Sequence, residues 1–329
     1  MTRRRLPDEF DLIATYFAPL ARGNAGAFGL LDDAALIDCT PGHRPVVTMD
    51  TLVGGVHFLA DDSPDLIARK LLRVNLSDLA AMGADARVYF MAISLTADID
   101  TAWIEAFAAG LAADQAEFGV RLAGGDITMT PGPLTLSLTA VGEVPEGREI
   151  RRSGAAPGED IYVSGTVGDA ALGLALLKGA VAGRTADGYP ALVDRYRVPQ
   201  PRVALGAALR GTATAAVDVS DGLVADLGHI CEASSVGAEI DAPLVPVSDG
   251  VRELLAADPA LLEQVLCGGD DYELVFTAVP AAAEIVARTA SRLNLAVCRI
   301  GRTVAGSGVA VADAAGRPMA LPRGGWRHF

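Results

Sequence analysis

Lysine is nearly absent from this chain of 329 residues, in which only Lys70 and Lys178 occur. Neither lysine lies in a G-x-x-x-x-G-K-S/T sequence, so the chain has no P-loop to hold nucleotide phosphates. The motifs H-R-D and D-F-G are missing too, which excludes a protein-kinase site. A phosphate ligand would therefore have to be held by other groups.

Cysteine and histidine are also scarce. The four cysteines are far apart and form no C-x-x-C pair, and the four histidines form no H-E-x-x-H motif. These absences exclude the common zinc sites. We expect the cysteines to be reduced thiols of a cytoplasmic protein.

Long apolar runs are missing as well. No uninterrupted stretch approaches the ~18 residues of a membrane helix. The basic start MTRRR is followed by acidic residues, not by the apolar core of a signal peptide. These features predict a protein that is not inserted in a membrane and stays in the cytoplasm.

Basic residues are outnumbered, with 27 against 41 acidic ones and a formal net charge of −14. Such a surface repels phosphate backbones, so we expect no nucleic acid partner. Hydrophobic residues make up 51% of the chain, enough for packed cores, although aromatics supply only 5%. The length predicts about two domains.

What the chain has instead is a series of aspartates, flanked by small residues at the ends of apolar stretches. The series is Asp32, Asp33, Asp50, Asp78, Asp126, Asp218, Asp221, Asp270 and Asp271. Carboxylates in such positions can hold Mg²⁺, which prefers oxygen ligands. A like-charge pair in an apolar context is costly unless a cation neutralises it. The series therefore predicts several Mg²⁺ ions bound to a phosphate-rich ligand.

Single members of the series have simpler explanations. Asn75 and Asp78 share one face of a predicted helix, where they could be solvated or form a local cap. The Gly-Gly-Asp sequence that ends at Asp126 could be an ordinary turn after a strand. Asp221 could cap the helix that follows it. Only the combination favours a metal site.

Arginines offer the missing positive charge. Arg148, Arg151 and Arg152 cluster in a stretch rich in Gly, Pro and Arg, residues 145–160. Their guanidinium groups are suited to bidentate contact with phosphate, although a solvated linker explains each of them equally well. The composition of this stretch predicts a domain boundary.

We therefore expect an N-terminal domain over 1–148 and a C-terminal domain over 149–329. Apolar spacing predicts helices over 63–82 and 101–118 and an alternating strand over 134–144. Both halves mix strands and helices without a regular β-α-β alternation. This pattern predicts an α+β fold in layers rather than a doubly wound sheet.

Taken in order, several segments resemble the thiamine-monophosphate kinase family. They include MDTLVGGVHF, KLLRVNLSDLAAMGA, VDVSDGLVADLGHI, GGDDYELVFT and GWRHF, and the resemblance covers nearly the whole chain. It implies the two-domain α+β fold of the aminoimidazole-ribonucleotide synthetase superfamily and a homodimer formed through the N-terminal sheets. It also implies that ATP phosphorylates thiamine monophosphate with the help of Mg²⁺, the first domain binding ATP and Mg²⁺ and the second completing the site.

The resemblance further assigns roles to residues of this sequence. Metal ligands would be Asp33, Thr48, Asp50, Asp78, Asp126, Asp218 and Asp221, together with the backbone carbonyl of Met49. The nucleotide would contact Gly125, Asp126, Arg152 and Ser220. Thiamine monophosphate would contact His57, Asp270 and Trp326.

Two departures from the family pattern affect this site. The family usually has Gly-Ile-Gly before the aspartate pair, where this chain has Gly29, Leu30 and Leu31. That change puts the backbone path before Asp33 in question. The usual Gly-Gly-Glu-Asp is Gly-Gly-Asp-Asp here, which shortens the side chain at Asp270 by one methylene.

No side chain is expected to act as a covalent nucleophile. The acceptor is a phosphate oxygen that is already ionised at neutral pH, so catalysis would depend on alignment and charge neutralisation. Mg²⁺ ions held by the aspartates would supply that neutralisation.

Two alternatives remain open. The first is a sister ATP-dependent enzyme of the superfamily. A selenophosphate synthetase would need a reactive cysteine near its start, where the first here is Cys39, and the hydrogenase-maturation enzyme would end in cysteine rather than Phe329. Aminoimidazole-ribonucleotide synthetase fits the motifs less well. The second alternative is an inactive nucleotide- and metal-binding relative, for which Leu31 and Asp270 would be the signature.

Overall fold

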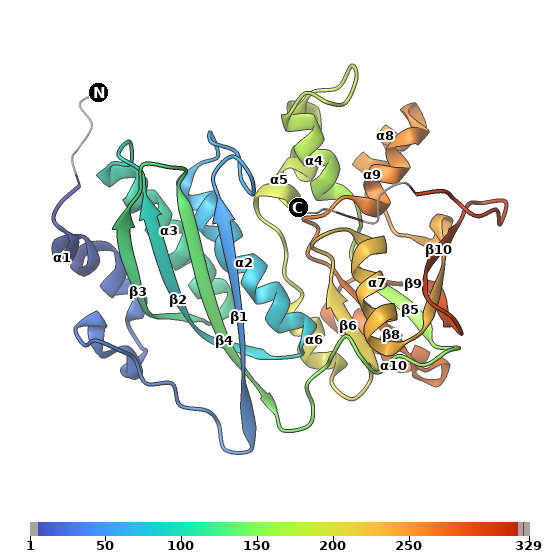
Figure 1. Ribbon diagram of the computed structural model, residues 1–329, viewed down its shortest axis with the longest axis horizontal. Coiled ribbons are helices and arrows are strands. Elements are labelled where there is room, and N and C mark those ends of the chain that lie inside the picture. Colours follow the sequence, from blue (N-terminus) through green and yellow to red (C-terminus); the bar gives the residue numbers. More distant parts are fainter. Residues whose placement is uncertain (1–5, 322–324, 326–329) are drawn as a thin grey trace. The chain divides into compact units, whose positions relative to one another are not determined.

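The computed structural model describes residues 6–321 and Gly325, and the chain forms two compact units (Figure 1). Among the described residues, unit 1 contains 6–79 and 84–146, and unit 2 contains 80–83, 147–321 and Gly325. The chain passes from unit 1 to unit 2 after Glu146, inside the stretch that we expected between two domains. The roles that we assign to the two domains stay predictions.

Unit 1 is built on a four-stranded sheet with the order β1-β4-β2-β3. Its strands are β1 (His43–Val53), β2 (Asp85–Leu95), β3 (Arg121–Met129) and β4 (Thr135–Pro145). β4 is antiparallel to both β1 and β2, whereas β2 and β3 are parallel. This order places β1 and β3 at opposite edges of the sheet.

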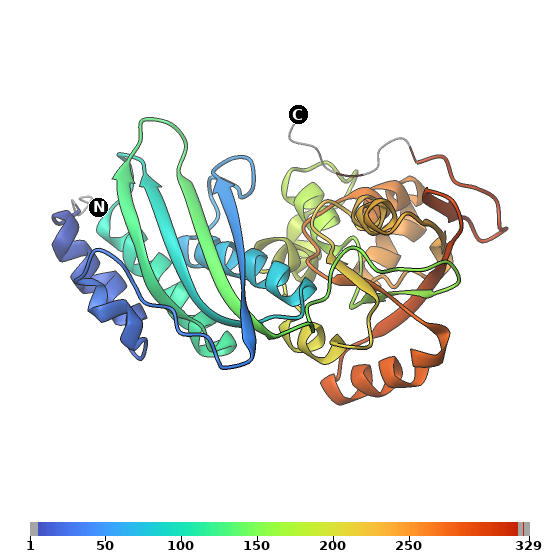
Figure 2. The ribbon, with the colours of Figure 1, turned by 60° about the horizontal axis from the view of Figure 1, so that its bottom comes forward.

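Two long helices, α2 (Pro64–Ala81) and α3 (Thr101–Phe118), cover one face of this sheet (Figure 2). Leu138 of β4 is fully buried on the helix side. On the other face, the side chains of Val47 and Met49 are 61% and 63% exposed. The second face of the sheet in unit 1 is therefore open.

The ends of α3 show why the helix forms where its sequence predicts. The carboxylate of Asp100 accepts the amide of Trp103, which satisfies one of the unpaired N–H groups of the first turn. Gly119 ends the helix in a left-handed conformation with φ of 74°, which glycine adopts without steric cost. Between these ends, Trp103 stacks on Phe107 with 5.0 Å between ring centroids.

The N-terminal part of unit 1 consists of α1 (Glu9–Leu12) and three short helical turns. Pro19 has no amide to continue a helical ladder, and the helical geometry changes at this point. The turns Ala18–Ala21 and Ala25–Leu30 contact β3. They build a wall beside that edge of the sheet.

Unit 2 contains a six-stranded sheet with the order β10-β7-β9-β5-β8-β6. Its strands are β5 (Asp160–Ser164), β6 (Ala215–Asp218), β7 (Gly237–Asp241), β8 (Leu274–Ala278), β9 (Val297–Val304) and β10 (Gly308–Ala312). The pair β10 and β7 is parallel, and the other pairs are antiparallel. Every residue of β5, β6 and β8 is buried, as continuous apolar runs predict.

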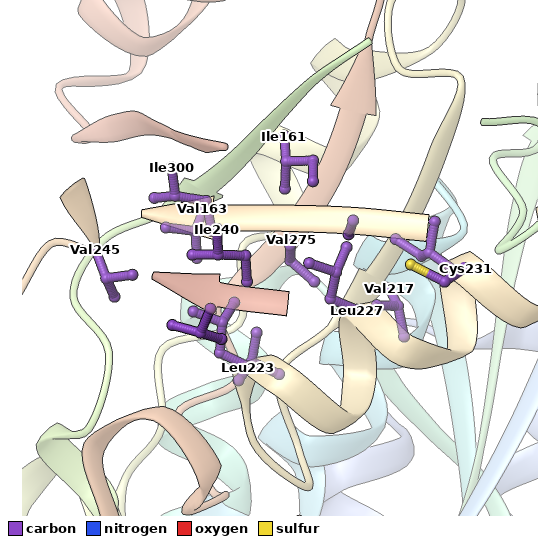
Figure 3. Close-up of a cluster of buried hydrophobic side chains, with 14 of the residues drawn as sticks. Ile161, Val163, Val217, Leu223, Leu227, Cys231, Ile240, Val245, Val275 and Ile300 are labelled. Carbon is purple, nitrogen blue, oxygen red and sulfur yellow. The ribbon is translucent and has the colours of Figure 1, made fainter. Parts of the chain in front are cut away.

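Seven helices accompany this sheet in the described part of unit 2. They are α4 (Asp169–Leu177), α5 (Pro190–Arg197), α6 (Val203–Leu209), α7 (Leu223–Ser234), α8 (Asp249–Ala257), α9 (Leu262–Cys267) and α10 (Ala283–Leu293). Leu227 of α7 packs with Val217, Val275, Ile161 and Ile300 of the strands in one buried cluster (Figure 3). Each such side chain contributes roughly 1.5–3 kcal/mol by leaving water.

The predicted α+β class with two domains is confirmed, because each unit combines a mixed sheet with helices. In the part of the chain that the structure describes, no helix has both the length and the apolar character needed to cross a membrane.

Candidate active site

β1 and α2 bring four predicted polar residues together in unit 1. The Thr48 hydroxyl donates to the Asp78 carboxylate, and the Asp50 amide donates to Oδ1 of Asn75 at 3.1 Å. Asn75 is fully buried, and its Nδ2 donates to the carbonyl of Leu71 at 2.9 Å. Asn75 is therefore not a solvated residue but part of a built polar group, which we call the β1–α2 group.

The electrostatics of this group favour a bound cation. Burial and, second, the charge of Asp78 raise the pKa of Asp50 to about 6. A cation between the two carboxylates would remove the repulsion that raises this pKa. The side chain of Met49 lies on the opposite, open face of the sheet, so Met49 could contribute only its carbonyl.

A second group of acids lines a cavity of about 490 Å³ at the β3 edge of unit 1. Asp32, Asp33 and Asp126 line it, together with Glu9 of α1. Most of the remaining wall is apolar and includes Phe17 from the N-terminal turns and Phe90 from β2. The structure thus brings Asp33 and the Gly-Gly-Asp sequence to one cavity.

The strand order separates these two groups. Across the sheet, Asp50 of β1 pairs with Leu138 of β4, and Leu138 pairs with Met91 of β2. Met91 in turn pairs with Gly125 of β3. Neighbouring strands are roughly 4.8 Å apart, so Asp50 and Gly125 are about 14 Å apart. Asp126 is the next residue of β3, and its side chain points to the opposite face from that of Asp50.

The packing of β3 against β2 explains why residue 125 is glycine, which the sequence did not reveal. The Gly-Gly-Asp sequence lies inside β3 and not in a turn after a strand, so the turn interpretation is wrong. A Cβ atom at Gly125 would come within 2.1 Å of the carbonyl oxygen of Met91. Strand pairing by itself therefore requires glycine at position 125. The contact of Gly125 with a nucleotide stays a prediction.

The loop before Asp33, where the sequence departs from the family pattern, has an unusual backbone. Phe28 and Leu30 adopt left-handed conformations, with φ of 49° and 61°, although neither is glycine. A bulky residue in this region costs about 1–2 kcal/mol. Leu31, the second departure in this loop, is 89% exposed.

His57 lies in a tight turn after β1. Its Nδ1 accepts the amide of Val53 at 3.0 Å, so the proton of the neutral ring is on Nε2. Lys70, which is 2% exposed, donates from Nζ to the carbonyl of His57 at 3.0 Å. A buried lysine therefore helps to fix a turn that the sequence assigned to substrate binding.

In unit 2, Asp218 ends β6 and is buried, and Ser220 and Asp221 follow in the loop before α7. Oδ2 of Asp226 accepts the amides of Asp221 and Gly222 at 3.0 Å each. Gly222 is the residue before the helix and has no side chain to cap it. The alternative that Asp221 caps α7 is therefore wrong, because the N-cap position belongs to Gly222 and no side chain caps the helix there.

Asp221, Asp226 and His229 each place one possible ligand atom within 4.8 Å of the others. Burial and, second, the charge of Asp221 raise the pKa of Asp226 to about 7. Neither Asp226 nor His229 was predicted to belong to the site. Their spacing of three residues on one helix was the available signal, but their proximity to Asp221 depends on the loop.

Asp270 lies on a segment that is tied to the loop after β6. The amide of Asp270 donates to the carbonyl of Ser220 at 2.9 Å, and the amide of Tyr272 donates to that of Val219 at 2.8 Å. A Cβ atom at Gly269 would come within 2.0 Å of the Ser220 carbonyl oxygen. The predicted nucleotide residue Ser220 and the predicted substrate residue Asp270 are therefore held side by side.

The structure says little about the predicted roles of Arg152 and Trp326. Arg152 is exposed, and its carbonyl accepts the hydroxyl of Ser234 at 3.0 Å. The neighbouring Arg151 forms an ion pair with Glu149. Trp326 lies outside the described residues.

Two family models match the chain. The model described as AIR synthase related protein, N-terminal domain, matches residues 31–144, and that described as AIR synthase related protein, C-terminal domain, matches residues 156–314. With the two-unit α+β fold, these matches define the chain as an AIR synthase-related protein.

Full-length relatives narrow this class. A thiamine-monophosphate kinase from Caulobacter vibrioides is 46% identical over 325 residues, 98% of this chain and 91% of the relative. The crystal structure of a thiamine-monophosphate kinase from Stenotrophomonas maltophilia is 45% identical, with a TM-score of 0.82 over 90% of this chain and 96% of that chain. A structure of AaThiL complexed with AMPPCP and TMP is 30% identical, with a TM-score of 0.76 over 93% and 98% of the chains. The chain belongs to the thiamine-monophosphate kinase family, and the resemblance found in the sequence is confirmed.

Proposed function

We propose that the chain transfers the terminal phosphoryl group of ATP to thiamine monophosphate, giving thiamine diphosphate and ADP. The observation that carries this proposal is the β1–α2 group, where the partly buried carboxylates of Asp50 and Asp78 interact on a strand and a helix. Such an arrangement suits cation-assisted phosphoryl transfer in a chain that has no P-loop. The relative AaThiL, whose structure is complexed with AMPPCP and TMP, supports the same substrates.

Mg²⁺ suits the oxygen donors of the predicted ligands, which lie in three groups. The residues that would hold it are Thr48, Asp50 and Asp78 in the β1–α2 group, Asp33 and Asp126 at the cavity, Asp218 and Asp221 after β6, and the carbonyl of Met49. The raised pKa of Asp50 supports this assignment, because a carboxylate beside another favours a divalent cation over a proton at neutral pH. When bound, Mg²⁺ would neutralise negative charge on the phosphates.

The cavity of unit 1 suits the nucleotide. Its volume of about 490 Å³ lies in the range of small-molecule pockets, and it combines an apolar wall with carboxylates. Phe17 and Phe90 offer apolar surface for the base, while Gly125 and Asp126 lie on the strand that forms the cavity edge. In this proposal Arg152 and Ser220 complete the contacts with the phosphates.

The chain's own groups position the acceptor. With the proton of His57 on Nε2, this nitrogen can donate a hydrogen bond to a phosphate oxygen of thiamine monophosphate. Asp270 and Trp326 would contact the same substrate. The attacking oxygen is already ionised, so no side chain removes a proton or forms a covalent intermediate.

We also propose a homodimer formed through the open face of the unit 1 sheet. Val47 and Met49 expose apolar side chains there, which a second copy could cover. Met49→Glu should convert the dimer to a monomer in sedimentation experiments, whereas Ile285→Glu, at an exposed apolar position of α10, should not. A dimer that survives Met49→Glu would contradict this interface.

A cytoplasmic location completes the proposal. All four cysteines are free in the structure, as expected for a reducing compartment. Nothing in the net charge of −14 favours a nucleic acid partner.

A coupled assay for ADP release tests the reaction. Thiamine monophosphate with ATP and Mg²⁺ should release ADP, and removal of Mg²⁺ with a chelator should abolish the release. Release with formylglycinamidine ribonucleotide instead would favour the sister synthetase. Nucleotide binding without turnover would favour an inactive relative.

A further inference from the structure

The segment from Gly268 to Glu273 has a backbone that its sequence alone does not favour. Asp270 and Tyr272 are left-handed, with φ of 70° and 52°, although neither is glycine. Such conformations persist where the surrounding structure holds them. Along the segment the side chains alternate, because Asp271 and Glu273 are fully buried while Asp270 and Tyr272 are partly exposed.

The buried side chains of the segment bind the body of unit 2. The two carboxylate oxygens of Asp271 accept the amides of Gly168 at 2.6 Å and Ala170 at 3.1 Å, at the start of α4. The carboxylate of Glu273 accepts the hydroxyl of Ser164 at 2.6 Å. These bonds hold the inner edge of the segment, but none of them binds its main-chain carbonyls.

Two arginines contact Glu273 in different ways. Arg202 binds the carboxylate with two nitrogens, and its Nε lies 2.6 Å from Oε2. Arg195, on α5, donates from Nη2 to Oε1 of Glu273 and to the backbone carbonyl of Asp271, each at 2.8 Å. Arg195 therefore joins a buried charge to the main chain between the two left-handed residues, which Arg202 does not.

We propose that Arg195 is a positioning residue, whose bond to the Asp271 carbonyl holds the segment so that Asp270 is presented to thiamine monophosphate. This inference rests on the proposed function. Arg195 acts through the backbone and does not touch the substrate. Residue 270 is aspartate here, whereas the family usually has the longer glutamate. The reach of its carboxylate therefore depends on the position of the backbone that carries it.

The structure indicates that Arg195 can be replaced without unfolding the chain. Glu273 keeps its bidentate contact with Arg202 and its bond from Ser164 when Arg195 is lost. In addition, Nη1 of Arg195 is buried without a hydrogen-bond partner, so Arg195→Met removes an unsatisfied group. Methionine keeps an unbranched apolar side chain at this position.

The test compares Arg195→Met with Arg202→Met, which removes an arginine from the same carboxylate but no bond to the main chain. Arg195→Met should raise the KM for thiamine monophosphate about tenfold or more and leave the KM for ATP within about twofold. Arg202→Met should lower the Tm more and change the KM for thiamine monophosphate less. Arg195→Lys, which keeps the charge, should restore part of the lost affinity.

Hydrogen exchange gives a second readout that does not depend on the reaction. The amides of Asp270 and Tyr272 should exchange at least about tenfold faster in Arg195→Met than in Arg202→Met. Equal exchange in the two variants, or equal changes in both KM values with Arg195→Met, would overturn the positioning role. Absence of ADP release by the unaltered protein with thiamine monophosphate would instead overturn the proposed function, while the exchange result would still decide whether Arg195 holds the segment.

Discussion

Unit 1 and unit 2 hold their acidic residues in different ways. In unit 1, Asp50 and Asp78 lie on a strand and a helix, whose own ladders fix the backbone. In unit 2, Asp221 and Asp270 lie in two loops that hydrogen-bond to each other. The acidic site in unit 1 should therefore respond mainly to changes of side-chain charge, and that in unit 2 mainly to changes of backbone geometry.

The largest effect is expected from removing a charge in unit 1. Asp50→Asn should reduce kcat by on the order of 10²–10³-fold while the fold persists, because a carboxylate is lost from the cation site. The coupled ADP assay measures kcat, and circular dichroism checks the fold. Asp126→Asn should have a comparable effect, whereas Asp61→Asn, at an exposed position outside the site, should not. Unaltered turnover in both site variants would refute the metal assignment.

The pH dependence of stability tests the charge of Asp50 in unit 1. The pKa of Asp50 is raised from 3.8 to about 6, so its ionisation destabilises the metal-free fold as pH rises through that window. Asp50→Asn should therefore match the unaltered protein near pH 4 and exceed its free energy of unfolding by up to about 3 kcal/mol above pH 6. Urea denaturation with a chelator measures this difference.

A carboxylate with the opposite shift serves as the control for that measurement. The backbone and side chain of Arg317 lower the pKa of Asp313, so its stabilising effect is present above the ordinary pKa and is lost as pH falls. Asp313→Asn should therefore be the less stable protein at neutral pH and should approach the unaltered protein in acid. The same sign for both variants would show that burial of Asp50 is not the cause.

In unit 2, the addition of one methyl group at Gly269 should disturb the two loops that contain Ser220 and Asp270. Gly269→Ala places a Cβ atom 2.0 Å from the Ser220 carbonyl oxygen, so the two loops must separate. We expect a loss of about 1–3 kcal/mol in the free energy of unfolding and a clear fall in kcat/KM for thiamine monophosphate. Chemical denaturation and the ADP assay measure the two effects. Normal stability and activity would show that the loops are not coupled.

The smallest expected effect has the opposite sign and comes from a glycine outside the loops. Gly228 lies inside α7, and a Cβ atom there would meet no other atom within 4 Å. Gly228→Ala should stabilise unit 2 by roughly 0.5–1 kcal/mol, because glycine loses more entropy than alanine in a helix. Thermal unfolding measures the shift, and unchanged KM values would confirm that the effect is local to the helix.

Elements with local signals were predicted well. α3 was expected over 101–118 and extends from Thr101 to Phe118, because its cap residues and apolar spacing lie within the helix itself. The strand expected over 134–144 is β4 (Thr135–Pro145), since alternation is also a local property. The position of Gly125 inside β3 was missed, because its close neighbour Met91 belongs to another strand.

Residue types and their order were enough to predict the class of fold, the family and the set of candidate carboxylates. Which of these carboxylates are neighbours depends on how the strands and loops pack. This packing places Asp50 beside Asp78 but on the opposite edge of the sheet from Asp126, and it ties Asp270 to Ser220. The physical reason is that strand order and loop-to-loop hydrogen bonds join residues distant in the chain, for which no local pattern exists.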